Sequence, residues 1–182
     1  NNMHNMKGVS LILSVLLFTV FMSSCANDEQ NPSPEDSYST LMVKADTKSA
    51  GMKSINESVE QIILTGNDIL WFNETTNEIR FKDNYYLQKS ISFYTDIKFY
   101  LDDDFLFSTI KVTDINSQIY NSPVLYYNMT ENKFYINDGY PEISVLKPQD
   151  KIQKARDKNM QAIANEWGKF IRYMKKVNKY KE

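Results

Sequence analysis

The hydrophobic and polar positions of the chain form three patterns, and the first is an apolar run near the N-terminus. Residues 9–22 are almost continuously apolar, with Lys7 before them and two small residues, Ser23 and Ser24, after them. A basic start, an apolar core and a small-residue end are typical of a secretory signal peptide. A transmembrane helix needs about 20 apolar residues, and this run is shorter and is interrupted by serine and threonine. The pattern therefore predicts a signal peptide at residues 1–24.

The second pattern is an apolar stripe near the C-terminus. After Pro148, apolar residues recur at spacings of three and four at Met160, Ile163, Trp167, Phe170, Met174 and Val177. This spacing places them on one face of an amphipathic helix. Basic residues crowd the last turns, where cations interact favourably with the helix dipole. We expect one long C-terminal helix whose stripe faces the core, with a membrane-surface helix or a partner-binding helix as the alternatives.

The third pattern is the alternation typical of β-strands. Ile97, Phe99 and Leu101 alternate with more polar residues, which predicts a half-buried strand. Three aspartates follow at 102–104 and apolar residues resume at 105–112, so we expect a hairpin turned by the aspartates. Calcium also prefers clustered carboxylates, but the EF-hand spacing and its glycine are absent. We therefore expect the triplet to solvate the edge of a sheet.

Two segments that lie 55 residues apart resemble each other. Residues 69–85 align with residues 124–140 without gaps. The matched positions include two pairs of asparagines, Asn73 with Asn128 and Asn77 with Asn132. Asparagine is favoured at the start of a tight turn and at its left-handed position. The pattern predicts a hairpin in the second segment.

The first of these segments allows two interpretations. Thr65 and Asp68 have the spacing of a capping box, which would begin a short helix with residues 69–72 as its body. Alternatively, residues 69–72 form a strand that turns back into residues 78–83, as in the second segment. We favour the capped helix, which would end at Asn73.

These elements define the expected fold and domain organisation. The fold class is α+β: an antiparallel sheet of five or six strands, built from hairpins, with the long C-terminal amphipathic helix across one face. A small β-barrel crossed by that helix is the alternative. Residues 25–54 are rich in small and polar residues and read as a flexible tether, with a short strand at 41–45. Residues 55–182, which begin with a strand at 59–64, form a single globular domain.

The composition excludes several classes of chemistry. The one histidine, His4, and the one cysteine, Cys25, both lie outside the expected domain. Catalytic triads based on histidine and the usual zinc, copper and haem ligand sets are therefore not expected. The glycines are isolated, so no phosphate-binding loop is present. We expect no cofactor, no metal and no enzyme activity, because only chemistry based on paired carboxylates stays possible.

Charge is distributed unevenly along the chain. Residues 148–182 contain ten basic and four acidic residues, whereas residues 26–147 contain ten basic and nineteen acidic residues. A basic end by itself suggests nucleic acid or a membrane surface. The acidic body and the expected export argue against nucleic acid as a partner.

Cys25 and the residues after it resemble a known export signal. A cysteine that directly follows an apolar run and small residues resembles the bacterial lipobox, which implies cleavage before Cys25 and acylation, including palmitate, of this residue. The acidic residues Asp28 and Glu29 resemble the signal that directs lipoproteins of the Bacteroidota to the cell surface. The segment "TGNDILWFNETTNEIRFKD" and residues 137–141 are similar to small surface lipoproteins of the Bacteroidales. The resemblance implies an outer-membrane protein that is lipid-anchored and faces the cell surface.

A binding role is the function that these observations favour. We expect an envelope lipoprotein that acts as a non-catalytic binding module for a glycan, peptide or protein. The alternative is a small inhibitor or immunity-type lipoprotein that acts against an envelope enzyme. Tyrosine and tryptophan suit binding surfaces. The candidate binding aromatics are Trp71, Tyr126 and Tyr127.

Overall fold

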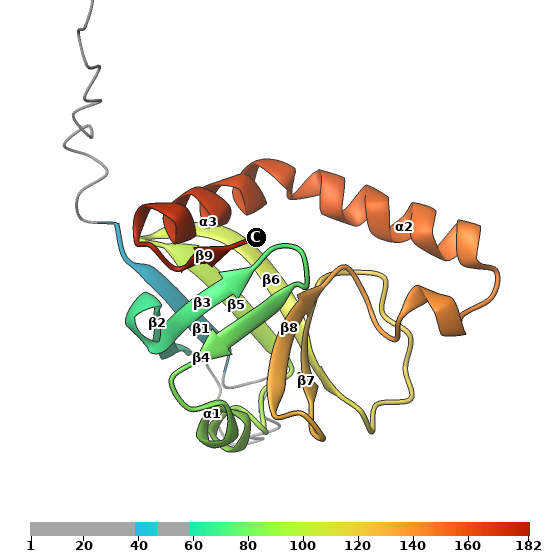
Figure 1. Cartoon of the computed structure of the whole chain (residues 1–182), viewed down its shortest axis with the longest axis horizontal. Helices are drawn as coiled ribbons and strands as arrows, with labels where there is room; N and C mark the ends of the chain where they lie inside the picture. The colour runs from blue at the N-terminus through green and yellow to red at the C-terminus, as the bar shows by residue number, and fades with distance from the viewer. Residues whose placement is uncertain (1–38, 47–58) are drawn as a thin grey trace, which may run out of the picture. The chain divides into compact units, whose positions relative to one another are not determined.

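The computed structural model describes residues 39–46 and 59–182, which form a curled sheet with helices packed against it (Figure 1). The expected signal peptide, Cys25, Asp28 and Glu29 lie outside the described residues. Within the described ranges, no helix has the length and apolar character that a membrane span requires.

The sheet of the described residues has nine strands in the order β2-β1-β5-β6-β7-β8-β4-β3-β9. The strands are β1 Leu41–Asp46, β2 Glu60–Thr65, β3 Ile69–Asn73, β4 Glu78–Phe81, β5 Asp96–Leu101, β6 Asp104–Thr113, β7 Val124–Asn128, β8 Lys133–Asn137 and β9 Tyr180–Lys181. The helices are α1 Asn84–Ser90, α2 Gln149–Ala162 and α3 Ala164–Lys176, and two short 3-10 turns are η3 Gly66–Asp68 and η4 Ile143–Val145.

The α+β class is confirmed, but the expected antiparallel sheet of five or six strands is wrong. β6 pairs with β7 in parallel, and so does β3 with β9, so the sheet is mixed. Residues 114–123, between β6 and β7, return the chain to the end of the sheet from which β7 runs parallel to the last part of β6. The alternative of a closed barrel does not form either, because β2 and β9 are the two ends of the strand order.

β1 lies in the stretch that was expected to be a tether. It pairs with both β2 and β5, and its residues Leu41, Val43 and Ala45 are buried in the core. The alternation of these three with half-buried neighbours confirms the short strand predicted there. The sheet therefore includes residues upstream of position 55.

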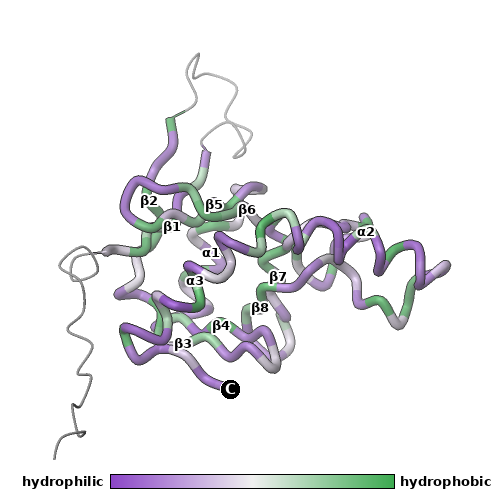
Figure 2. Tube along the Cα trace, turned by 90° about the horizontal axis from the view of Figure 1, so that it is seen from above, coloured by the Kyte–Doolittle hydropathy of each residue, from purple (hydrophilic) through white to green (hydrophobic). Residues whose placement is uncertain are grey.

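The single long C-terminal helix is wrong in one respect: it is two helices that meet at Ile163. This residue has φ −110° and ψ 11°, and its backbone N–H donates to Met160 O, three residues back. α3 buries Phe170 and Met174 against the sheet, as the apolar stripe predicted. α2 is largely hydrophilic along its length (Figure 2), and its one fully buried side chain is Arg156.

α3 packs across the concave side of the sheet through aromatic rings. The ring of Phe170 lies 5.3 Å from that of Phe72 on β3, 6.1 Å from Phe99 on β5 and 5.7 Å from Phe107 on β6. These rings come from strands on both sides of the curl, so one side chain of α3 ties the two halves together. Trp167 is half-buried and contacts the same cluster.

The capped helix favoured for residues 66–73 is wrong, although its capping box exists. The Thr65 backbone N–H donates to the Asp68 carboxylate over 2.8 Å, and together they cap the 3-10 turn η3. The chain then leaves the turn as strand β3, because Ile69 and Phe72 are both fully buried in the sheet core. Local capping and the strand are compatible because the helix lasts a single turn.

The asparagine turn predicted in the second segment forms, and the first segment, for which a helix was favoured, has a turn of the same geometry. Asn73 Oδ1 accepts a hydrogen bond from Thr76 N over 2.8 Å, and Asn128 Oδ1 accepts one from Glu131 N over 2.9 Å. The second asparagines, Asn77 and Asn132, have φ of 59° and 54° and therefore occupy the left-handed region. These turns close the hairpins β3–β4 and β7–β8.

The aspartate turn between β5 and β6 is confirmed, but it does not lie at the edge of the sheet as expected, because both strands have neighbours on either side. Asp102 has φ 54°, and its carboxylate accepts a hydrogen bond from Thr40 N over 2.7 Å. Asp102 N also donates to Thr40 O over 2.9 Å. The first aspartate therefore fixes the end of β1 to the turn, while Asp103 stays exposed.

Candidate functional site

The three aromatic residues predicted for binding do not form one surface. Trp71 lies on β3, where the ammonium of Lys181 is 4.0 Å from the centre of its ring. Tyr126 and Tyr127 are neighbours on β7, so they point to opposite faces of the sheet. Tyr127 is only 4% exposed and packs on Phe134 with ring centres 4.7 Å apart. Tyr127 is therefore a core residue and not a surface aromatic.

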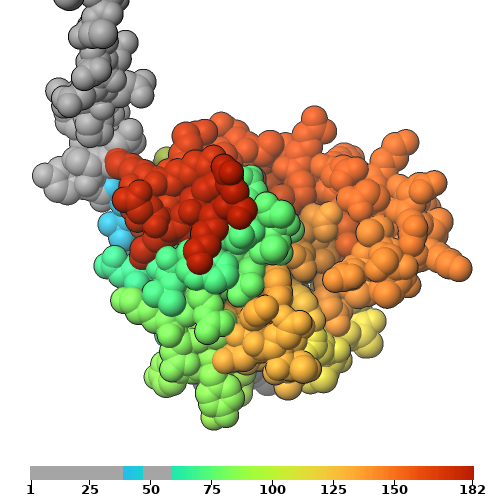
Figure 3. Space-filling view, viewed as in Figure 1, coloured from blue at the N-terminus to red at the C-terminus, as the bar shows by residue number. Residues whose placement is uncertain are grey.

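Tyr126 belongs instead to a cluster of three half-buried tyrosines on the outer face of the sheet. Its ring stacks on that of Tyr135 with centres 5.9 Å apart and planes at 25°. The ring centre of Tyr140 lies 5.5 Å from that of Tyr126, and the two planes are tilted by 40°. We call Tyr126, Tyr135 and Tyr140 the tyrosine face. The surface formed by β7 and β8 lies next to the hairpin β3–β4 in the space-filling view (Figure 3).

Backbone pairing places each of these rings. Tyr126 and Tyr135 are directly opposite each other in the antiparallel pair β7–β8, where cross-strand side chains meet on one face. Tyr140 is held by a bridge with Tyr120, in which each backbone N–H donates to the other carbonyl over 2.8 and 2.9 Å. Tyr135 and Tyr140 were not among the binding residues predicted from the sequence. The position of Tyr135 could have been predicted, because the register of the predicted hairpin places it opposite Tyr126.

Hydrogen bonds to carboxylates fix the hydroxyl groups of two of these rings. Asp114 accepts a hydrogen bond from the Tyr126 hydroxyl and another from Met129 N over 2.8 Å. The Tyr135 hydroxyl donates to Glu131 over 3.1 Å. Burial, and next the hydrogen bond to Asp114, raises the pKa of Tyr126 above its usual range, and burial and Glu131 raise the pKa of Tyr135 in the same direction. Both rings therefore keep their protons at physiological pH.

A polar pocket of about 380 Å³ adjoins the tyrosine face along β8. Asn137 lines this pocket and lies two residues after Tyr135, so both side chains are on the same side of the strand. We call this hollow the polar pocket. Its other polar lining residues include Asn77, Asp138, Glu142, Gln153 and Arg156. The pocket is thus bounded by the tip of the hairpin β3–β4, the end of β8 and helix α2.

Arg156 forms the wall of the polar pocket on the side of α2. The side chain is 2% exposed, and its Nη2 donates to Pro141 O over 2.7 Å. Its Nη1 lies 3.6 Å from Asp138 Oδ1, and Gln153 Nε2 donates to the other oxygen of Asp138 over 3.2 Å. A buried guanidinium needs such partners because an unpaired buried charge is costly. Arg156 therefore holds α2 to the end of β8.

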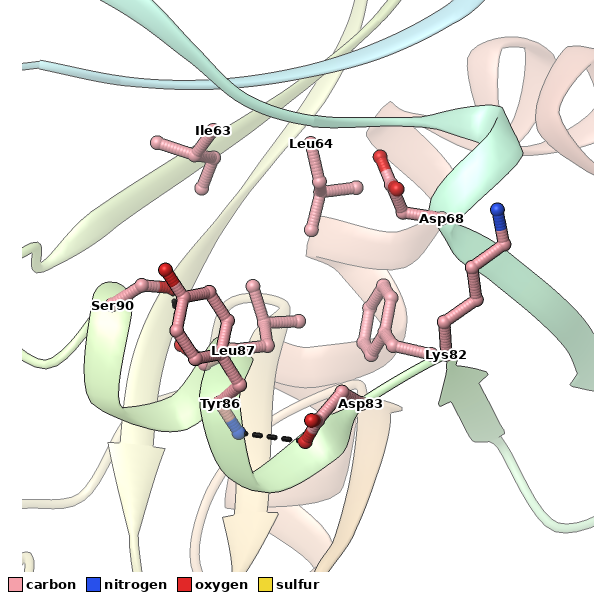
Figure 4. A pocket seen from close by; sticks show the side chains of 9 residues that line it. Ile63, Leu64, Asp68, Lys82, Asp83, Tyr86, Leu87 and Ser90 are labelled. Carbon is pink, nitrogen blue, oxygen red and sulfur yellow. Dashed lines mark hydrogen bonds between the residues drawn. The ribbon is translucent and has the colours of Figure 1, made fainter.

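A second, smaller pocket of about 210 Å³ lies between β2, the end of β4 and α1 (Figure 4). Its floor is apolar, and it includes Leu64, Phe81 and Leu87. The carboxylates at its rim serve as caps: Asp68 bonds to Thr65, and Asp83 accepts from Tyr86 N over 2.8 Å. This pocket therefore offers an apolar floor but no pair of carboxylates that is free of backbone bonds.

The site contains no arrangement that points to metal chemistry. Among residues 39–46 and 59–182, no group of three or more histidine, cysteine, aspartate or glutamate side chains is placed to hold a metal ion.

A scan against protein-family models and searches of curated proteins and of solved structures find no match to this chain. The function of the protein is therefore inferred from the tyrosine face and the polar pocket.

Proposed function

We propose that the protein is an envelope lipoprotein that binds a glycan, without catalysis, on the tyrosine face. The observation that carries this proposal is the stack of Tyr126, Tyr135 and Tyr140 at the surface beside a polar pocket. The C–H faces of a sugar ring are apolar and pack on aromatic rings, whereas its hydroxyl groups need hydrogen-bond partners. A surface with flat rings next to amide and carboxylate groups offers both kinds of contact.

The fixed position of the rings supports this proposal. Tyr126 is held by Asp114 and Tyr135 by Glu131, so neither ring loses much freedom when a ligand packs on it. A binding surface that is ordered in advance has a smaller entropic cost of association. Ile115 and Met129 lie near Asp114 and are 82% and 52% exposed. These two side chains add to the exposed apolar area.

An inhibitor or immunity-type function is the second candidate. The observation that favours it is the turn between β5 and β6, where Phe105 is 52% exposed and packs on Tyr100 with ring centres 5.5 Å apart. An exposed aromatic residue two positions from Asp103 suits contact with a partner protein. We place glycan binding first, because the tyrosine face has three rings and an adjoining pocket.

Alanine substitutions on the tyrosine face test the proposed glycan binding. We expect Tyr126→Ala and Tyr135→Ala each to weaken binding to a neutral polysaccharide by about tenfold, since a central aromatic contact contributes more than 1 kcal/mol. Tyr135→Phe keeps the ring and should retain most of the affinity. The purified lipoprotein in detergent is screened by affinity electrophoresis against neutral plant and microbial polysaccharides.

Tyr86 provides the matched control for these substitutions. It is a tyrosine on α1 that is 70% exposed and lies at the smaller pocket. Tyr86→Ala should leave glycan binding unchanged. The proposal fails if the wild-type protein binds none of the polysaccharides, or if the substitutions at Tyr126 and Tyr135 have no more effect than the one at Tyr86.

The lipid anchor and the surface address are the second part of the proposal, and the sequence alone supports them. We expect Cys25→Ala to abolish labelling with a palmitate analogue and to release the protein from the outer-membrane fraction. Replacement of both Asp28 and Glu29 by alanine should keep the label but reduce cleavage by protease added to intact cells. Labelled, membrane-bound Cys25→Ala protein would contradict the anchor, and unchanged cleavage of the double variant would contradict the export signal.

A further inference from the structure

We infer that the polar pocket is a subsite of the glycan site and that its charge selects neutral sugars over anionic ones. This inference rests on the proposed function, because it names the class of sugar that the same surface takes. Continuity along β8 is the first step: Tyr135 and Asn137 share one side of the strand, so a chain stacked on the tyrosines can extend a sugar into the pocket.

The lining of the pocket matches the hydroxyl groups of a sugar. Asn77 and Asn137 supply amide donors and acceptors from two neighbouring hairpins. Gln153 lines the pocket from α2, with its Nε2 already donating to Asp138 and Asp157. Glu142 and Asp138 supply acceptors at the same opening. Convergent polar groups around a hollow are what fixes the orientation of a polar ligand.

Two cations of this region, Arg156 and Lys133, lie next to carboxylates and are not free to bind an anion. Arg156 is 2% exposed, and Pro141 O and Asp138 engage its two terminal nitrogens. Its Nε has no hydrogen-bond partner, but it is enclosed beside Gly139 and does not reach a ligand. Lys133, at the other end of β8, lies 3.2 Å from Glu131 and 3.9 Å from Glu78. Neither cation therefore offers the unpaired positive charge that recognition of a carboxylate or sulfate requires.

Carboxylates outnumber these cations along the tyrosine face and the pocket. The carboxylates are Asp114, Glu131, Glu78, Asp138 and Glu142, against the cations Arg156, Lys133 and Arg80, the last of which lies two residues after Glu78 on the same side of β4. Glu142 has no ion pair among the described residues and lines the pocket itself. A sugar that carries a carboxylate would be repelled at this opening, and the repulsion would decrease with salt because Glu142 is solvent-exposed.

A chemical series from one glycan tests the inference. The probe is a polysaccharide bound by the wild-type protein in the preceding screen, its derivative with the primary hydroxyl groups oxidised to carboxylates, and the methyl ester of that derivative. We expect the oxidised form to bind about tenfold more weakly at low salt, and the neutral methyl ester to bind like the parent. Recovery with the ester attributes the loss to charge and not to the missing hydroxyl.

A charge-removing variant locates the effect. Glu142→Gln should reduce the ratio between the affinities for the neutral and the oxidised form about threefold, because it removes one negative charge at the opening while its amide oxygen can still accept a hydrogen bond. Asp103→Asn removes one charge at the exposed turn between β5 and β6 and should change neither. Equal or tighter binding of the oxidised glycan, or equal effects of the two variants, would overturn the inference and leave glycan binding intact. If the wild-type protein binds none of the glycans, the proposed function is overturned instead.

Discussion

Replacing Phe170 with alanine is expected to lower the free energy of unfolding by about 3–5 kcal/mol. The side chain is fully buried, and its ring contacts Phe72, Phe99 and Phe107 from three different strands. Removing it leaves a cavity where α3 closes the curled sheet, and the surrounding rings cannot all collapse into the space. A loss of this size is a large part of the stability of a small domain.

Chemical denaturation followed by tryptophan fluorescence measures this loss. Phe93→Ala is the matched control, because Phe93 is 70% exposed and its replacement should change the stability by less than about 0.5 kcal/mol. Trp167→Ala, followed by circular dichroism, should fall between the two since this residue is only half-buried. A cost of less than about 1 kcal/mol for Phe170→Ala would show that α3 does not close the core.

The apolar stripe of α3 was predictable from the sequence, but the break before it was not. Met160, Ile163 and Trp167 keep the helical spacing across the break, so the pattern contains no signal that α2 ends at Ala162. The break separates a helix that covers the sheet core from one that is anchored by Arg156. Which face each helix buries depends on tertiary contacts that periodicity does not encode.

The hairpins show the same division between local and tertiary signals. Asn77 and Asn132 specify left-handed turn positions by themselves, and both turns were visible in the repeat of the sequence. The conformation of residues 69–73 depends instead on tertiary packing. As a strand, Ile69 and Phe72 are fully buried in the sheet, which a short helix would not provide. A strong capping box at Thr65 therefore predicted the turn correctly and the following element wrongly.

The candidate site was predictable to the extent that it follows from strand pairing. The hairpin β7–β8 places Tyr135 opposite Tyr126, and this register follows from the asparagine turn. Tyr140 and the polar pocket depend on the bridge to Tyr120 and on the docking of α2, which join residues far apart in the chain. No local pattern marks such contacts.

Replacing Gly139 with alanine is expected to destabilise the protein by about 1–3 kcal/mol, the usual cost of overpacking. A Cβ at this position would stand 2.3 Å from Arg156 Nε and 2.5 Å from Tyr120 O. The guanidinium is enclosed, and the Tyr120 carbonyl is held by its bond to Tyr140 N, so neither neighbour moves freely. To relieve the clash, Arg156 would have to move, and this residue both anchors α2 and forms a wall of the polar pocket.

Gly168 on α3 supplies a control with the opposite sign. A Cβ there would meet only the end of the flexible Arg172 side chain, at 3.3 Å. Gly168→Ala should therefore stabilise the protein by about 0.5–1 kcal/mol, since alanine is the better helix former. Denaturation of both variants, with the glycan assay in parallel, separates the two sites: Gly139→Ala should lose stability and affinity together, whereas Gly168→Ala should keep its affinity. Wild-type stability and binding in Gly139→Ala would mean that Arg156 does not pack against residue 139 and does not shape the pocket.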